Sequence, residues 1–109
     1  GLDGLARMKG LMSGLRSNPL GEIAGTPVIT RKDYSSGMEV SVATGVQHAM
    51  DLSGSNVLRY KLADGTDLIV RPSGTEPKVK VYILAQGESK EDCDAKVAKY
   101  AAWAESLKN

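Results

Sequence analysis

The sequence lacks phenylalanine and contains only one cysteine, Cys93, and one histidine, His48. A single cysteine excludes an internal disulfide and a cysteine-rich metal site, because both need more than one sulfur atom. A single histidine leaves little material for a histidine-based metal centre or a multi-histidine mechanism. We therefore expect no metal site in this chain, and we expect Cys93 to be reduced and buried on a helix.

Excess charge and long apolar runs are also missing. The 14 Lys and Arg residues nearly balance 13 Asp and Glu residues, for a formal net charge of +1. This balance argues against a polybasic nucleic-acid arm and against an acidic tail. No apolar run approaches the ~20 residues of a membrane span, and no signal peptide is visible, so we expect a cytoplasmic protein without a membrane partner.

What the sequence does contain is typical of one globular domain covering residues 1–109. Hydrophobic residues make up 41% and charged residues 25% of the chain, which are ordinary values for such a domain. The chain opens with Gly1-Leu2-Asp3 rather than methionine. We expect it to be a piece of a longer protein.

Helical periodicity marks both ends of the chain, over residues 2–17 and 89–108. The expected apolar face of the first helix consists of Leu5, Met8, Met12 and Leu15. Ser89 with Asp92 forms a near capping box at the start of the second helix. The expected apolar stripe of that helix consists of Cys93, Val97, Tyr100, Ala104 and Leu107, with Trp103 at its edge.

Between the helices, alternation of apolar and polar residues predicts strands. The four expected strands cover residues 26–32, 56–62, 66–71 and 78–85. This order of elements favours an α+β domain. We expect an antiparallel four-stranded sheet with two helices packed on one face, because an antiparallel sheet can leave its other face to solvent.

The connections carry further signals. Asp64-Gly65 predicts a two-residue hairpin turn of type I′, which needs φ > 0 at both central positions. Residues 34–55 are expected to form an irregular loop with one turn of helix around 46–52. Such a long loop is uncommon in a compact domain, which suggests a functional or interdomain role.

The segment from Arg71 to Lys78 joins two expected strands and carries the strongest sign of chemistry. The planar guanidinium of Arg71 suits bidentate binding of phosphate. Ser73 and Thr75 add hydroxyl donors, and Gly74 can adopt φ > 0, which lets backbone N–H groups converge on an anion. The plain alternative is a tight polar connection with a solvated arginine.

Residues beside this segment modify its charge. Lys78 and Lys80 add positive potential, whereas Glu76 opposes anion binding unless it points away or orients Lys78. No nucleophile stands next to a base, and no pair of carboxylates is present. We therefore expect no catalytic residue in this chain.

The longer stretch Arg71–Tyr82 resembles the C-terminal signature of the α-D-phosphohexomutases, the phosphoglucomutase/phosphomannomutase family. The hairpin before it and the closing helix are also similar, and the strong resemblance covers residues 56–87. It implies the fourth, TBP-like domain of a four-domain enzyme. It also implies substrate-phosphate contacts from Arg71, Ser73, Gly74 and Thr75, with Gly74 acting through its backbone.

The same resemblance implies an isomerase that interconverts hexose 1-phosphate and hexose 6-phosphate through a phosphoserine and a bisphosphate intermediate. The phosphoserine and the Mg²⁺-binding aspartate loop of the family lie in earlier domains, and neither motif occurs here. We therefore expect a chain that is inactive alone, holds no cofactor, and works with other domains of an Mg²⁺-dependent enzyme. Residues 56–82 are similar to bacterial phosphoglucomutases, so glucose phosphates are the expected substrates, with mannose or pentose phosphates left open.

Two other classes of function were weighed, a nucleic-acid-binding module and a protein-interaction module. The basic sheet face could form a base-stacking platform, made of Arg59, Tyr60, Lys61, Lys78, Lys80 and Tyr82. The missing RNA-binding signature, the absence of phenylalanine and the small net charge argue against it, so we expect no nucleic-acid partner. The sequence leaves the protein-interaction module open.

Overall fold

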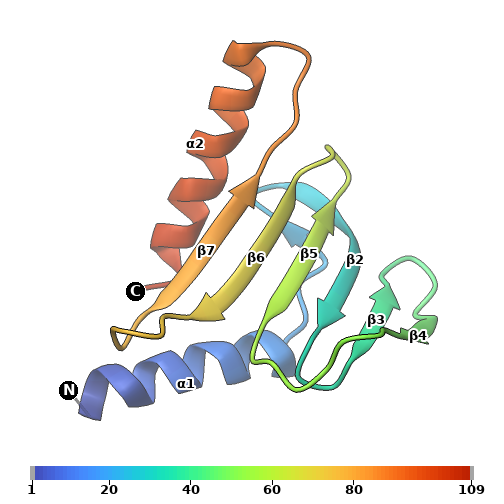
Figure 1. Ribbon diagram of the computed structural model, residues 1–109. Coiled ribbons are helices and arrows are strands. Elements are labelled where there is room, and N and C mark those ends of the chain that lie inside the picture. Colours follow the sequence, from blue (N-terminus) through green and yellow to red (C-terminus); the bar gives the residue numbers. More distant parts are fainter. Residues whose placement is uncertain (1, 109) are drawn as a thin grey trace.

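The computed structural model describes residues 2–108. Its elements are helix α1 (Leu2–Ser17), strands β1 (Glu22–Ile23), β2 (Thr26–Asp33), β3 (Met38–Ser41), β4 (Gln47–Ala49), β5 (Leu58–Leu62), β6 (Asp67–Pro72) and β7 (Val79–Leu84), and helix α2 (Lys90–Ser106). Figure 1 shows α2 alongside β7, and α1 crossing below the ends of the central strands. Neither helix in residues 2–108 has the length and hydrophobicity that a bilayer-spanning segment requires.

The strands pair in the order β4-β3-β2-β5-β6-β7, every pair antiparallel, and the short β1 pairs with the start of β2. The α+β class and the antiparallel sheet are confirmed, but the expected count of four strands is wrong. Two of the additional strands, β3 and β4, lie in residues 34–55, where an irregular loop with a helical turn was expected. The strand β4 is exposed throughout, and β3 contains only two apolar residues, Met38 and Val40, too few to predict a strand from alternation.

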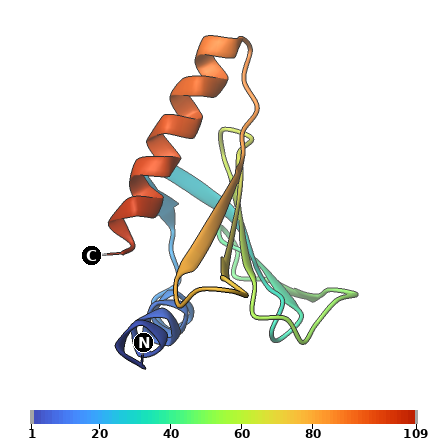
Figure 2. The ribbon, with the colours of Figure 1, turned by 60° about the vertical axis from the view of Figure 1, so that its left-hand side comes forward.

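Both helices cover the same face of the sheet, here called the helix-covered face, and leave an open face on the other side (Figure 2). The core between them consists of Met12, Ile23, Val28, Leu58, Tyr60, Leu62, Leu68, Val70 and Tyr100. The β5–β6 register pairs Leu58 with Val70 and Tyr60 with Leu68, so these side chains share one face. Met12 of α1 and Tyr100 of α2 reach the same cluster from above.

The helix bounds agree with the prediction, and Ser89 caps α2 by accepting a hydrogen bond from the Asp92 N–H at 3.0 Å. The predicted apolar stripes are partly wrong, because Leu5 is 39% and Val97 41% exposed. The first turns of α1 lie against Pro77 rather than the sheet, since a Cβ on Gly4 would lie 3.2 Å from the Pro77 ring. Cys93 is only partly buried, not enclosed as expected.

The β5–β6 hairpin turns through three residues, so the predicted two-residue type I′ turn is wrong. The Leu62 N–H donates to the Thr66 carbonyl at 2.8 Å, and the Gly65 N–H donates to the Leu62 carbonyl at 3.1 Å. Gly65 has φ of +87°, whereas Asp64 keeps a negative φ. This is the pattern of a β-turn followed by a glycine bulge. The Asp64 carboxylate supports the turn by accepting a hydrogen bond from the Thr66 N–H at 3.0 Å.

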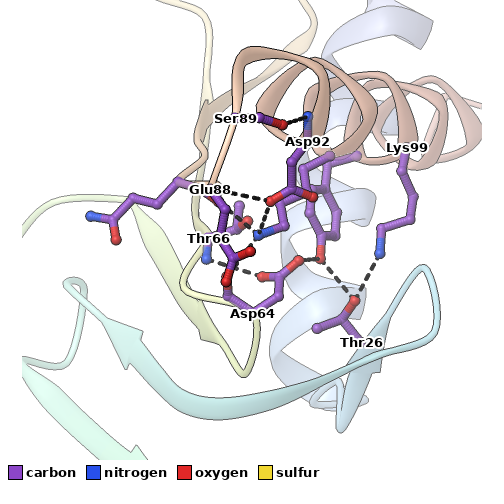
Figure 3. Close-up of polar contacts among 10 residues, drawn as sticks. Thr26, Asp64, Thr66, Glu88, Ser89, Asp92 and Lys99 are labelled. Carbon is purple, nitrogen blue, oxygen red and sulfur yellow. Dashed lines mark hydrogen bonds and ion pairs between the residues drawn. The ribbon is translucent and has the colours of Figure 1, made fainter.

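A polar network joins α2 to this turn and to the start of β2 (Figure 3). The Tyr100 hydroxyl donates to Asp64 Oδ2 at 2.6 Å and lies 2.8 Å from Thr26 Oγ1. Lys99 Nζ donates to the same Thr26 oxygen at 3.1 Å. Burial alone would raise the pKa of Asp64, but the hydrogen bonds from Tyr100 and Thr66 outweigh it and lower that pKa.

We predict that Tyr100→Phe destabilises the chain by about 2 kcal/mol near neutral pH, because the variant loses a hydrogen bond to a charged acceptor. The lowered pKa of Asp64 stabilises the fold above its unfolded-state value of about 3.9, and this contribution disappears as the pH falls through the folded-state pKa. Urea unfolding should therefore show a smaller deficit in strong acid than at neutral pH. A deficit independent of pH would contradict this role of Asp64. Tyr34→Phe, outside the network, is the matched control.

Candidate functional site

Residues 73–78 connect β6 to β7 at the end of the sheet that lies next to α1, and are here called the β6–β7 loop (Figure 1). The strand register places Arg71 opposite Lys80 and Pro72 opposite Val79. The Ser73 N–H donates to the Lys78 carbonyl at 2.7 Å, which extends the ladder by one further pair. The sheet therefore fixes both ends of the loop.

Arg71 is held on the open face by two hydrogen bonds. Its Nη1 donates to the Pro72 carbonyl at 3.0 Å, and its Nη2 donates to the Tyr82 hydroxyl at 3.1 Å. The guanidinium carbon also lies 5.6 Å from the centroid of the Tyr82 ring, a favourable cation–π distance. Because a guanidinium carries five N–H donors, these two contacts orient Arg71 and leave donors for a ligand.

Tyr82 is a member of this site that the sequence analysis did not recognise. It was interpreted as an outward residue of a sheet face, with no link to Arg71. The available signal was its spacing, since Tyr82 follows Lys80 by two residues on β7 and Lys80 lies opposite Arg71. Side chains two residues apart on a strand share a face.

Ser73 organises the backbone of the β6–β7 loop. Its buried side chain accepts hydrogen bonds from the N–H groups of Thr75 at 3.3 Å and Glu76 at 3.2 Å. Its Oγ also lies 3.4 Å from Thr75 Oγ1. These distances are long for hydrogen bonds, so an anion could replace them with shorter, charge-assisted ones.

Gly74 behaves differently from the prediction. Its φ is not positive, unlike that of five other glycines within residues 2–108, so the predicted anion-binding turn through a left-handed Gly74 is not formed here. The residue is exposed, and a Cβ added to it would meet nothing within 4 Å. Among the described residues no acceptor binds its N–H. Gly74 is therefore the residue of the loop whose backbone N–H is unpaired within residues 2–108 and whose surroundings are unobstructed.

The lysines near the loop differ in their surroundings. Lys80 shares the open face with Arg71, so two cations lie opposite each other across the β6–β7 ladder. Lys78 is exposed, and its Nζ lies 3.5 Å from Glu76 Oε2. Glu76 thus orients Lys78, although an ion pair this exposed contributes little to stability. The positive charge of the site comes mainly from Arg71 and Lys80.

No group of three or more His, Cys, Asp or Glu side chains within residues 2–108 is arranged to hold a metal ion. His48 is exposed in β4, where it lies opposite Glu39 of β3. The described chain therefore does not assemble the several oxygen ligands that Mg²⁺ requires.

Comparison with known proteins identifies the family to which this chain belongs. The family model described as phosphoglucomutase/phosphomannomutase, C-terminal domain, matches residues 29–100, which include the whole β6–β7 loop. A "Probable phosphomannomutase" from Haemophilus influenzae is 38% identical over 96 residues, which is 88% of this chain. A "Phosphoglucomutase" from Staphylococcus aureus is 33% identical over 97 residues, or 89% of the chain.

The chain spans 17% of the length of each of these two relatives. A "Phosphoglucomutase" from Staphylococcus saprophyticus is 32% identical over 89 residues, which cover 82% of this chain and 16% of that protein. No solved structure matches the chain significantly. The resemblance predicted from the sequence is confirmed, and the chain belongs to the family of phosphoglucomutase/phosphomannomutase C-terminal domains.

Proposed function

We propose that this chain is the substrate-phosphate-binding domain of a phosphosugar mutase. The observation that carries the proposal is the β6–β7 loop, because the sheet fixes both of its ends and Arg71 lies beside it on the open face. The chain's membership of the family adds support. The names of the relatives, phosphomannomutase and phosphoglucomutase, support hexose phosphates as the substrate class. Among the hexose phosphates, we propose glucose 1-phosphate and glucose 6-phosphate as the substrates. We also propose that the full-length enzyme is cytoplasmic.

Four residues make the proposed phosphate contacts. Arg71 binds two phosphate oxygens through its free N–H groups, and Ser73 and Thr75 donate their hydroxyl hydrogens. Gly74 contributes its N–H, and the absence of a side chain there lets the phosphate approach the backbone. Lys80 supports the site by its charge, because a cation on the same face raises the local potential for anions.

This domain's task follows from the chemistry of phosphoryl transfer, which depends mainly on positioning and on charge stabilisation. We propose that the loop holds the phosphate that is not reacting, while the other end of the sugar meets a phosphoserine in another domain. The bisphosphate intermediate then turns around, and the same loop accepts the second phosphate. A site that recognises only the phosphate serves both orientations of the sugar.

The other parts of the machinery are proposed to lie outside residues 1–109, which we take as one domain of the full-length enzyme. The chain contains no match to the family's phosphoserine motif. Because residues 2–108 do not assemble Mg²⁺ ligands, the Mg²⁺ of the full-length enzyme is proposed to be bound by other domains. The isolated chain is accordingly expected to bind phosphate without catalysing its transfer.

We predict that the isolated chain binds glucose 6-phosphate weakly and that Arg71→Ala lowers the affinity at least about tenfold, the effect of losing a charge-assisted hydrogen-bond pair. Titration followed by amide chemical shifts should locate the largest changes at residues 71–78. Lys61→Ala, an exposed change on the open face away from the loop, should leave the affinity almost unchanged. Equal affinities of wild type and Arg71→Ala would refute the proposed contact.

We also predict that Gly74→Ala separates binding from folding. Neither a positive φ nor a neighbouring atom within 4 Å opposes the new methyl group, so the free energy of unfolding should change by less than about 1 kcal/mol. The methyl group would occupy the position through which the phosphate approaches, so glucose 6-phosphate should bind at least several-fold more weakly. Gly21→Ala, equally unobstructed but outside the loop, is the matched control. If Gly74→Ala bound glucose 6-phosphate with the affinity of the wild type, Gly74 would not be a phosphate contact.

A further inference from the structure

A second hollow, distinct from the β6–β7 loop, opens on the helix-covered face beside the C-terminal part of α1. Its volume is about 360 Å³, and it shares no lining residue with the loop. Its polar lining includes Arg16, Arg31, Asp33 and Tyr60. A volume of this size is within the range of small-molecule sites. We call it the α1 hollow.

The strand register explains why these side chains meet. Arg31 of β2 lies opposite Tyr60 of β5, so both project to the helix-covered face. Arg16 reaches the same place from α1, where its Nε donates to Asp33 Oδ2 at 3.1 Å. The guanidinium of Arg31 is anchored by a hydrogen bond from Nη1 to the Leu20 carbonyl at 2.9 Å. Three elements therefore converge on one hollow without a local sequence motif.

Tyr60 and Arg16 both line the α1 hollow, and among residues 2–108 each has a buried polar atom without a hydrogen-bond partner. Tyr60 is 1% exposed, and its hydroxyl has no hydrogen-bond partner among residues 2–108. Within the same described residues, Arg16 Nη2 is also buried without a partner. Buried polar groups are almost always hydrogen-bonded, so each such exception needs an explanation.

The charged residues that line the α1 hollow are mainly cationic, since Arg16, Arg31 and Lys32 outnumber the single carboxylate, Asp33. Asp33, the carboxylate of the lining, already accepts from Arg16, from the Ser35 N–H at 2.9 Å and from the Ser35 hydroxyl at 2.7 Å. Burial raises the pKa of Tyr60 to about 12, although the charges of Arg31 and Arg16 act against that rise. The phenol therefore keeps its proton at neutral pH and can donate it. An arrangement of two guanidinium groups and a phenol is complementary to an oxyanion, which only accepts hydrogen bonds.

We propose that the α1 hollow binds the phosphate or carboxylate group of a small metabolite through Arg16, Arg31 and Tyr60. This site is separate from the β6–β7 loop and does not rest on the function proposed for that loop. Water satisfying the same donors is the competing occupant. An oxyanion is favoured because the charged lining residues are three cations, Arg16, Arg31 and Lys32, and one carboxylate, Asp33, which already accepts three hydrogen bonds.

The test uses the 109-residue chain carrying Arg71→Ala, so that the β6–β7 loop does not compete for the ligand. Inorganic phosphate and malonate are titrated separately, against sodium chloride at matched ionic strength, and followed by amide chemical shifts and thermal unfolding. We expect saturable shifts at residues 16, 31 and 60, and a rise in melting temperature, with at least one of the two anions. Shifts with phosphate only or malonate only identify the preferred oxyanion.

Two variants in this background make the test specific. Tyr60→Phe should lower the affinity for the anion at least fivefold. It should not lower the melting temperature of the ligand-free chain, because it deletes an unpaired hydroxyl. Arg31→Gln should also lower the affinity for the anion at least fivefold, whereas the control Tyr34→Phe should leave it unchanged. The proposal would be overturned if neither anion shifted these residues, or if Tyr60→Phe bound the anion with unchanged affinity. It would also be overturned if Tyr60→Phe were less stable without ligand and showed no effect of the anion, which is the result expected if water occupies the hollow.

Discussion

The pairing of β6 with β7 is the interaction on which the candidate site depends. It places Arg71 opposite Lys80, and the Ser73–Lys78 hydrogen bond closes the connection between the strands. The other face of the same strands carries Val70 and its neighbours into the core. A shift of one residue in register would exchange the two faces and move Arg71 under the helices. Core packing therefore determines which way the arginine points, and the loop needs little ordering when a ligand arrives.

The two proposed binding sites lie on opposite faces of the sheet. On the open face, Tyr82 accepts a hydrogen bond from Arg71, the residue that we propose binds the substrate phosphate. On the helix-covered face, Tyr60 belongs to the core and, together with Arg16, also lines the α1 hollow. The family match establishes what kind of domain this is. Our proposals assign anion binding to both faces, and they assign to this domain the positioning of a substrate while the transfer occurs in other domains.

Local signals in the sequence predicted the parts of the fold that are determined locally. Both helices, the capping by Ser89 and four of the strands follow from periodicity and capping chemistry. The strands β3 and β4 were not predicted because β4 is exposed throughout and β3, with four half-buried residues, is too short to show a clear alternation. The sequence predicts that the β6–β7 loop binds phosphate, which stays a prediction, whereas the expected positive φ of Gly74 is not found. The Arg71–Tyr82 contact and the α1 hollow join residues from different elements, so they depend on the strand register and on how α1 packs against the sheet.

The central claim is that strand pairing, rather than the ligand, builds the β6–β7 loop. Hydrogen exchange of the amides of residues 73–78, measured with and without glucose 6-phosphate, tests it most directly. The account predicts that the Ser73 amide is already protected in the free chain, because it donates to the Lys78 carbonyl at 2.7 Å. The ligand should then add protection at Gly74. Rapid exchange at Ser73 that slows only when glucose 6-phosphate binds would contradict the claim.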